Sequence, residues 1–146
     1  MDIGSGSGSP GLPLAAASPH RSFSLLDSSR RKCEFLRPFA AELANIRVVW
    51  GRAEEQEREA YGVAVAKALA KPPVAAELAL PLVKVGGVAV IWTGESADPA
   101  AVGRVAVQLA AELESVDDGL LVLRKVGPTP SGFPRKPGIA RKRPLA

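Results

Sequence analysis

Apolar and polar segments alternate along the chain in a pattern that predicts strands and helices in turn. Short apolar runs at residues 21–27, 46–50, 63–67, 88–92 and 120–126 predict strands. Most of these runs are nearly continuous in apolar residues, which is typical of parallel strands that are covered on both faces. The pattern therefore predicts an α/β fold, a mostly parallel sheet with helices on both faces.

The segments between these runs have helical features. Helices are expected from Leu12 to Ala17, from Ser28 or Ser29 to about Leu43, and from Pro72 to about Leu80. Further helices are expected from Asp98 or Pro99 to about Glu114 and, for one or two turns, in the charged segment 54–60. Residues 84–87 predict a turn, and Pro38 is expected to kink or restart the second helix.

Charge divides the chain into a body, residues 1–126, and a tail, residues 127–146. The net charge is +4, yet the residues from Arg124 onward include seven basic residues and no acidic one. The rest carries 12 basic and 15 acidic residues, a net charge of −3. A basic tail on a mildly acidic body indicates either contact with a polyanion or a solubilising tail. Its many prolines and glycines predict an extended segment without regular structure.

Other composition features narrow the function classes. Cys33 and His20 are the only residues of their types among 146, so an intrachain disulfide and a cysteine-rich metal site are excluded. Cys33 is expected in the core and His20 in a loop. The chain has neither an apolar stretch of about 20 residues nor a secretory signal pattern. These features predict a cytoplasmic protein that is not membrane-bound.

A glycine-rich loop and a following acid carry the candidate chemistry. Residues 2–8 read DIGSGSG and fit D-x-G-x-G-x-G, and Asp27 follows Gly6 by 21 residues at the end of the next predicted strand. Glycines let the backbone approach a ligand, and an acid at that distance can accept both hydroxyls of a ribose. In isolation the loop also fits a flexible linker. Asp2, just before the first glycine, favours a methyltransferase over a dehydrogenase, because it can pair with the amino-acid end of the cofactor.

Several segments together resemble a known family. DIGSGSGSPGLPLA, LLDSSRRKCEFL, GRAEE and the tail TPSGFPRKPGIARKRPL are similar to the ribosomal RNA small subunit methyltransferase G family, also called the glucose-inhibited division protein B family. The tail segment is the most specific of these. The resemblance implies a Rossmann-like class I methyltransferase fold. It also implies S-adenosylmethionine-dependent methylation of guanine N7 in 16S ribosomal RNA, within the small ribosomal subunit, by a protein expected to be monomeric.

The resemblance assigns cofactor contacts to eight residues. Gly4 matches a loop glycine, Asp27 the ribose acid, and Ala53-Glu54 a pair along the adenine, although a plain helix start also explains that pair. Ser9 stands where the family has Phe or Leu, and Lys67 where most members have Arg, so an apolar contact and a bidentate fork are lost. Lys67 also fits a surface lysine at a strand end. The full set is Asp2, Gly4, Gly6, Ser9, Asp27, Ala53, Glu54 and Lys67.

The expected chemistry needs little beyond binding. Guanine N7 has a free lone pair, so it requires no deprotonation before it attacks the activated methyl group. We therefore assign no catalytic residue and no metal ligand. RNA contact is expected from two basic groups: Arg30, Arg31 and Lys32, which also fit a solvated helix face, and Arg135, Lys136, Arg141, Lys142 and Arg143 of the tail. Phe133 either stacks on a base or pins the tail to the body.

The glycine loop begins at the second residue, where this fold has a buried first strand preceded by helices. We therefore expect the first strand and the N-terminal helices to be missing, and the chain to be marginally stable and weakly active. Two other functions stay open: a non-catalytic RNA-binding remnant of such an enzyme, and a nicotinamide-dependent reductase or small-molecule methyltransferase. The basic tail counts against this last class.

Overall fold

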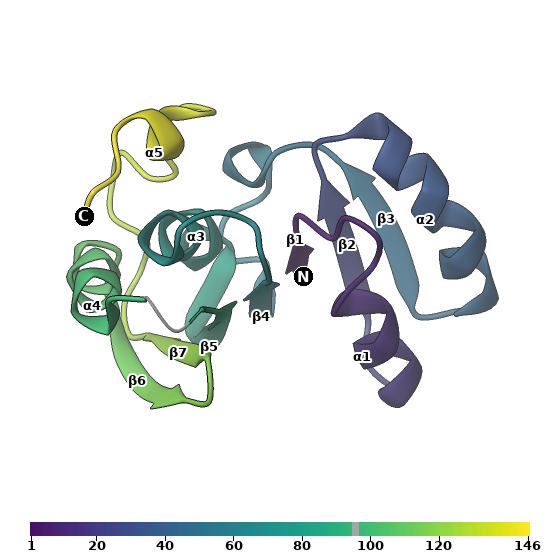
Figure 1. Cartoon of the computed structure of the whole chain (residues 1–146), viewed down its shortest axis with the longest axis horizontal. Coiled ribbons are helices and arrows are strands. Elements are labelled where there is room, and N and C mark those ends of the chain that lie inside the picture. The colour runs from purple at the N-terminus through teal and green to yellow at the C-terminus, as the bar shows by residue number, and fades with distance from the viewer. Residues whose placement is uncertain (95–96) are drawn as a thin grey trace.

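The computed structural model describes residues 1–94 and 97–146, and within them seven strands form one sheet (Figure 1). The strand order is β3-β2-β1-β4-β5-β7-β6. Neighbours from β3 to β5 are parallel, whereas β7 is antiparallel to both β5 and β6. The prediction of a mostly parallel sheet is confirmed. The strands are β1 (Asp2–Ile3), β2 (Phe23–Asp27), β3 (Ile46–Trp50), β4 (Tyr61–Ala66), β5 (Val83–Trp92), β6 (Ala111–Asp117) and β7 (Leu120–Lys125).

Helices connect the strands in two groups. The first group packs on β2 and β3, and the second packs on the half of the sheet from β4 to β6 (Figure 1). The chain winds outward from β1 to β3 and then returns to β4 on the other side of β1, so right-handed crossovers place the two groups on opposite faces. The helices are α1 (Gly11–Ala17), α2 (Arg30–Glu42), α3 (Pro72–Ala79), α4 (Pro99–Gln108) and α5 (Ile139–Lys142), with 3₁₀ turns η1 (Ala53–Glu55) and η2 (Leu80–Leu82).

The central position of the sheet is occupied by the two-residue strand β1. Asp2 lies opposite Leu25 of β2 and Val65 of β4, and Ile3 lies opposite Leu26. The expectation that this strand is missing is therefore corrected: two residues of it are present, because their backbone groups complete the ladders of both neighbours. Strand order reverses between β1 and β4, and ligands of such sheets bind at this switch point.

The Asp2 carboxylate is buried below the glycine loop. Its Oδ2 accepts a hydrogen bond from the Gly11 N–H at 3.0 Å, at the start of α1, and only 2% of the residue is exposed. Burial raises the pKa of Asp2 above its ordinary value. Gly11 is needed at this contact, because a Cβ there would lie 2.7 Å from Asp2 Oδ2 and collide with Leu25.

Two predictions about the second half of the chain were wrong. The fourth helix ends at Gln108, and the segment that was expected to continue it is strand β6. Its residues favour helices, but they pair with β7 from Ala111 to Asp117, and an Asp118-Gly119 turn with positive φ angles joins β6 to β7. The expected turn at residues 84–87 lies inside β5 instead. There the pairing of β4 with β5 shifts register, so the glycines form an irregularity within a strand.

The tail packs on the body. Ala140 of α5 is 2% exposed and Phe133 packs against the core, so the prediction of a tail without regular structure was wrong at Ile139–Lys142, and Phe133 does pin the tail to the body. Lys125, the last residue of β7, is fully buried just before the tail. It donates to Thr129 Oγ1 at 2.6 Å and lies 3.4 Å from Glu59 Oε1. Glu59 also accepts from the Thr129 N–H at 2.6 Å.

None of the helices in the described part of the chain combines the length and the apolar character that a membrane crossing requires.

Replacement of Asp2 separates its hydrogen bond from its charge. Asp2→Ala leaves the buried Gly11 N–H without an acceptor, which is expected to lower the free energy of unfolding by about 1–3 kcal/mol. Asp2→Asn keeps an acceptor oxygen and removes a buried charge, so it is expected to remain within about 1 kcal/mol of the parent chain. Urea unfolding followed by circular dichroism measures both. Equal losses in the two variants would contradict this account of the contact.

Glu59 makes stability depend on pH. Hydrogen bonds from Thr129, and then Lys125, hold the pKa of Glu59 below its ordinary value of 4.5. The stabilisation by Glu59 is therefore fully present above that value and is lost as the pH falls through the lower pKa of the folded state. Glu59→Gln is expected to flatten the stability profile below about pH 5, whereas Glu57→Gln, an exposed neighbour, leaves it unchanged. Urea midpoints at several pH values test this; identical profiles for Glu59→Gln and the parent chain would refute it.

Candidate functional site

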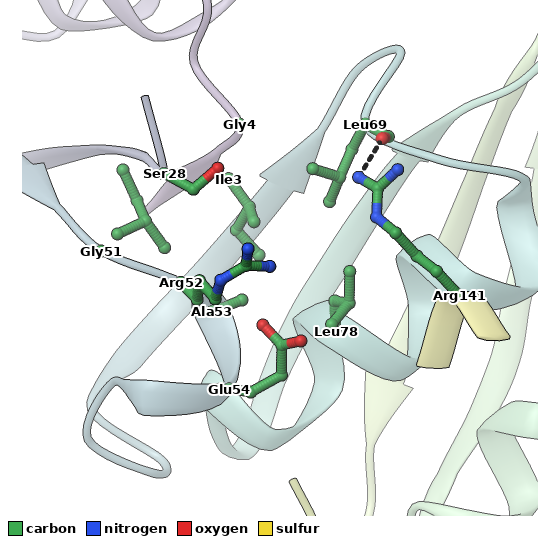
Figure 2. Close-up of a pocket in the computed structure, with 11 residues that line it drawn as sticks. Ile3, Gly4, Ser28, Gly51, Arg52, Ala53, Glu54, Leu69, Leu78 and Arg141 are labelled. Carbon is green, nitrogen blue, oxygen red and sulfur yellow. Dashed lines mark hydrogen bonds between the residues drawn. The ribbon is translucent and has the colours of Figure 1, made fainter. Parts of the chain in front are cut away.

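A cavity lies at the carboxyl ends of the central strands, beside the switch point (Figure 2). The cavity itself is small, about 60 Å³, and is open to solvent, so the site is an open groove and not an enclosed pocket of the ~300–1,000 Å³ that usually holds a small molecule. Its walls come from the glycine loop, the ends of β2 and β3, the segment after β4, α3 and the tail. The lining residues are Ile3, Gly4, Leu26, Ser28, Gly51, Arg52, Ala53, Glu54, Leu69, Leu78 and Arg141.

The glycine loop forms one wall through its backbone. Gly4, Gly6 and Gly8 have φ angles of +71°, +56° and +98°, a region that other residues rarely adopt. The N–H groups of Gly4 and Ser5 both donate to the Leu26 carbonyl, at 2.8 and 3.0 Å. A Cβ at Gly4 would lie 2.6 Å from Leu69 Cδ1, across the cavity floor. Glycine at this position therefore keeps space between the loop and the segment after β4.

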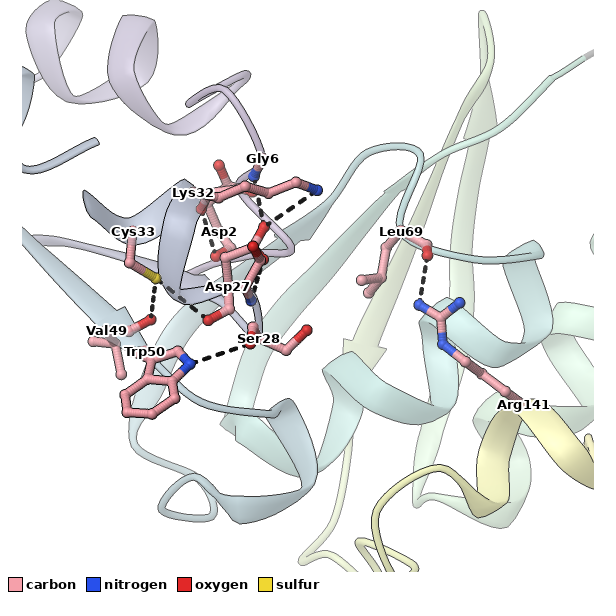
Figure 3. A network of polar contacts seen from close by, with 12 residues as sticks. Asp2, Gly6, Asp27, Ser28, Lys32, Cys33, Val49, Trp50, Leu69 and Arg141 are labelled. Carbon is pink, nitrogen blue, oxygen red and sulfur yellow. Dashed lines mark hydrogen bonds and ion pairs between the residues drawn. The ribbon is translucent and has the colours of Figure 1, made fainter. Parts of the chain in front are cut away.

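Asp27 holds the loop in place (Figure 3). Its Oδ2 accepts from the Gly6 N–H at 2.9 Å and its Oδ1 accepts from the Ser29 N–H at 2.8 Å. Lys32 Nζ lies 4.0 Å from Oδ2. The side chain is almost fully buried and does not line the cavity; its neighbour Ser28 does. Each carboxylate oxygen can accept two hydrogen bonds, so Asp27 retains acceptor capacity toward a ligand.

The remaining predicted cofactor residues fall into two groups. Ala53, which is buried, and Glu54 lie in η1 and line the cavity. Ser9 and Lys67 lie outside it, where Lys67 Nζ donates to Ser9 Oγ at 3.1 Å and so bridges the loop to the end of β4. Asp2 also lies outside it, because its carboxylate faces Gly11 below the loop. The expected pairing of Asp2 with the amino-acid end of a cofactor therefore has no counterpart in this side-chain position.

The basic residues at the start of α2 are exposed but not equivalent. Arg30 Nε lies 3.0 Å from Glu34 Oε1, and its guanidinium lies 5.9 Å from the centre of the Trp50 ring. Lys32 approaches Asp27, as described above. Arg31 is exposed. The three residues follow the cavity residue Ser28 in the sequence, separated from it by Ser29, and none of them lines the cavity.

The basic residues of the tail separate into fixed and exposed ones. Arg135 donates to both carboxylate oxygens of Glu77, each at 2.6 Å, and also to the Arg143 carbonyl at 2.8 Å. Arg141 lines the cavity and donates to the Leu69 carbonyl at 2.9 Å. The residues Lys136, Arg141, Lys142 and Arg143 are all exposed. The predicted RNA-contact role thus fits these four exposed residues better than Arg135, whose guanidinium is paired with a buried carboxylate.

Cys33 and His20 lie where the sequence predicts. Cys33 is fully buried in α2 and donates to the Asp27 carbonyl at 3.4 Å, and burial raises the pKa of its thiol. His20 is exposed in the loop before β2. Within residues 1–94 and 97–146, no group of three or more His, Cys, Asp or Glu side chains is placed to hold a metal ion.

Several cavity residues were not predicted from the sequence. Ile3, Leu26, Leu69 and Leu78 are apolar and give no sign of a site in the sequence. Arg52 and Gly51 belong to the GRAEE segment, which pointed to Ala53 and Glu54 only. Arg141 is predicted from the sequence as an RNA contact and not as a cavity residue. Its position beside Leu69 depends on a contact between residues 72 positions apart, which the local sequence does not indicate.

Comparisons with known proteins identify the family of the chain. Residues 1–115 match a family profile described as rRNA small subunit methyltransferase G. Proteins named ribosomal RNA small subunit methyltransferase G from Synechococcus sp. (strain JA-3-3Ab) and Deinococcus radiodurans are 40% and 39% identical to the chain, each over 164 aligned positions. Both alignments cover 99% of this chain, but 63% and 65% of the respective relative. The chain thus spans under two thirds of the length of these relatives.

Solved structures with the same fold are more distant in sequence. One is the 16S rRNA N2 G1207 methyltransferase of T. thermophilus in complex with AdoMet and guanosine, with a TM-score of 0.65, 17% identity, and coverage of 88% of this chain and 35% of the other. Another is an O-methyltransferase from neocarzinostatin biosynthesis in complex with S-adenosylmethionine, with a TM-score of 0.71, 17% identity, and coverage of 86% and 48%. At these identities the similarity shows a shared fold.

Proposed function

The chain belongs to the ribosomal RNA small subunit methyltransferase G family, and we propose that it transfers a methyl group from S-adenosylmethionine to N7 of a guanine in 16S ribosomal RNA. The observation that carries this proposal is the cavity at the switch point, because its walls contain the glycine loop and the Ala53-Glu54 segment that the family resemblance assigns to the cofactor. Relatives of that name match 99% of this chain.

The residues at the cavity fit S-adenosylmethionine. Gly4 offers a backbone without a side chain, and Ala53 and Glu54 form a small apolar surface with an acceptor beside it, which suits an adenine. Asp27 holds the loop through Gly6 and has acceptor capacity left for ribose hydroxyls. Ser9 and Lys67 lie outside the cavity, and their hydrogen bond ties the glycine loop to the end of β4.

The main task of the protein in this reaction is to align the methyl group of the cofactor with guanine N7. The bound cofactor supplies an activated methyl group on a sulfonium, and guanine N7 supplies the lone pair. The chain has to hold both in line and to exclude water, and neither task requires a general base. The glycine loop, which is held by Asp27, and the apolar cavity floor formed by Leu26, Leu69 and Leu78 suit this role.

The RNA substrate would meet exposed basic side chains. We place Arg30, Arg31 and Lys32 on one side of the cavity and Lys136, Lys142 and Arg143 on the other, and each can contact a phosphate. Such contacts predict binding that weakens as salt is added. We further propose that the protein acts as a monomer on the small ribosomal subunit, in the cytoplasm.

Titration calorimetry with S-adenosylmethionine tests the cofactor site. The parent chain is expected to bind in the micromolar range, and Asp27→Ala to weaken binding about tenfold or more, because it releases the loop and removes a charged acceptor. Asp117→Ala, an exposed acid on β6, serves as the control and should leave binding unchanged. A parent chain that gives no binding heat would favour a non-catalytic RNA-binding remnant.

Methyl transfer to small ribosomal subunits that lack the modification tests the substrate. The expected product is 7-methylguanosine in the nucleoside digest of 16S rRNA, measured by mass spectrometry. Free guanosine serves as the comparison, since a small-molecule methyltransferase would modify free guanosine as well as it modifies the ribosomal subunit. Cofactor binding without transfer to the subunit would contradict the proposed substrate.

A further inference from the structure

Arg141 reaches the cavity from the tail. It lies in α5, and it is 72 residues from its partner Leu69 in the sequence. Figure 2 shows its guanidinium beside Leu69, across the cavity from Arg52 and Glu54. One of its N–H groups donates to the Leu69 carbonyl at 2.9 Å. A guanidinium carries five N–H donors, so others are available to a bound molecule.

Three contacts fix the segment that carries Arg141. Arg135 makes the two-pronged contact with Glu77, whose side chain is 3% exposed. The Gly138 N–H donates to Glu54 Oε1 at 2.9 Å, directly at the cavity wall. The Ala140 side chain is buried in the core. Because a buried carboxylate without its partner is costly, the Glu77 pair keeps the segment on the body and α5 beside the cavity.

We propose that Arg141 is a cofactor-binding residue that contacts the adenosine part of S-adenosylmethionine, with Arg135 as the positioning residue that holds its segment; this inference rests on the proposed function. Two of the predicted RNA contacts are thereby reassigned. The tail is then a wall of the cofactor site, and its exposed residues Lys136, Lys142 and Arg143 remain for RNA.

The chemistry of the contact favours the adenosine end. Glu54, which the family resemblance assigns to the adenine, is hydrogen-bonded to Gly138 of the same short segment, so Arg141 and Glu54 belong to one structural unit. A planar guanidinium can stack on a purine ring or donate to its nitrogens, which a lysine ammonium does less well. A sulfonium would repel the guanidinium, so the methyl-bearing end is a poor neighbour for it.

Calorimetry with three variants tests this inference. Arg141→Ala is expected to weaken binding of S-adenosylmethionine about tenfold, and Arg141→Lys to recover only part of the loss. Lys142→Ala, the adjacent exposed cation, is the matched control and is expected to leave cofactor affinity unchanged. S-adenosylhomocysteine shares the adenosine part but has no sulfonium, so its affinity should fall by the same factor in Arg141→Ala.

The outcomes separate this inference from the proposed function. If the parent chain binds neither S-adenosylmethionine nor S-adenosylhomocysteine, both the proposed function and this inference are wrong. If the parent chain binds and Arg141→Ala stays within twofold, or if Lys142→Ala shows the same loss, only the inference fails. A loss confined to S-adenosylmethionine would also overturn the adenosine contact. A parallel urea titration identifies a structural role: if Arg141→Ala and Arg141→Lys both unfold more readily and bind weakly to the same extent, Arg141 only supports the fold.

Discussion

Two buried or nearly buried carboxylates hold the glycine loop, and the site depends on both. Asp2 binds the N–H at the end of the loop, at Gly11, and Asp27 binds the N–H in its middle, at Gly6. A loop with three glycines at positive φ has many alternative conformations when it is free, so these contacts select one of them. They also connect β1, β2 and α1, and the cavity keeps its shape as long as this connection holds.

A third acid, Glu77, organises the opposite side of the cavity. Glu77 lies among the apolar residues of α3, and a charge buried there requires a partner. Arg135 is that partner, and it brings the tail over residues that are distant in the sequence. Of the basic residues that follow, Arg141 is thereby brought to the cavity.

The sequence predicts the first half of the fold well and the second half less well. The strands near residues 23–27 and 46–50 and the helix of Arg30–Glu42 were recognised because each has an apolar run or a capped, periodic pattern. The strand β6 was read as helix because Ala, Glu and Leu favour helices locally, whereas its pairing with β7 decides its conformation. In the site, the positions of Gly4, Ala53 and Glu54 follow from the family resemblance. The apolar lining and the role of Arg141 follow from long-range packing, which periodicity does not report.

The contacts of the tail also affect the order in which parts of the structure can form during synthesis. The N–H of Gly138 and the side chains of Arg135 and Arg141 bind partners 84, 58 and 72 residues earlier in the chain. During synthesis from the N-terminus, the glycine loop, β2 and η1 therefore emerge well before the residues that close the cavity, since long-range contacts wait for both partners. The wall of the cavity that Arg141 forms can therefore be completed only after α5 has been synthesised.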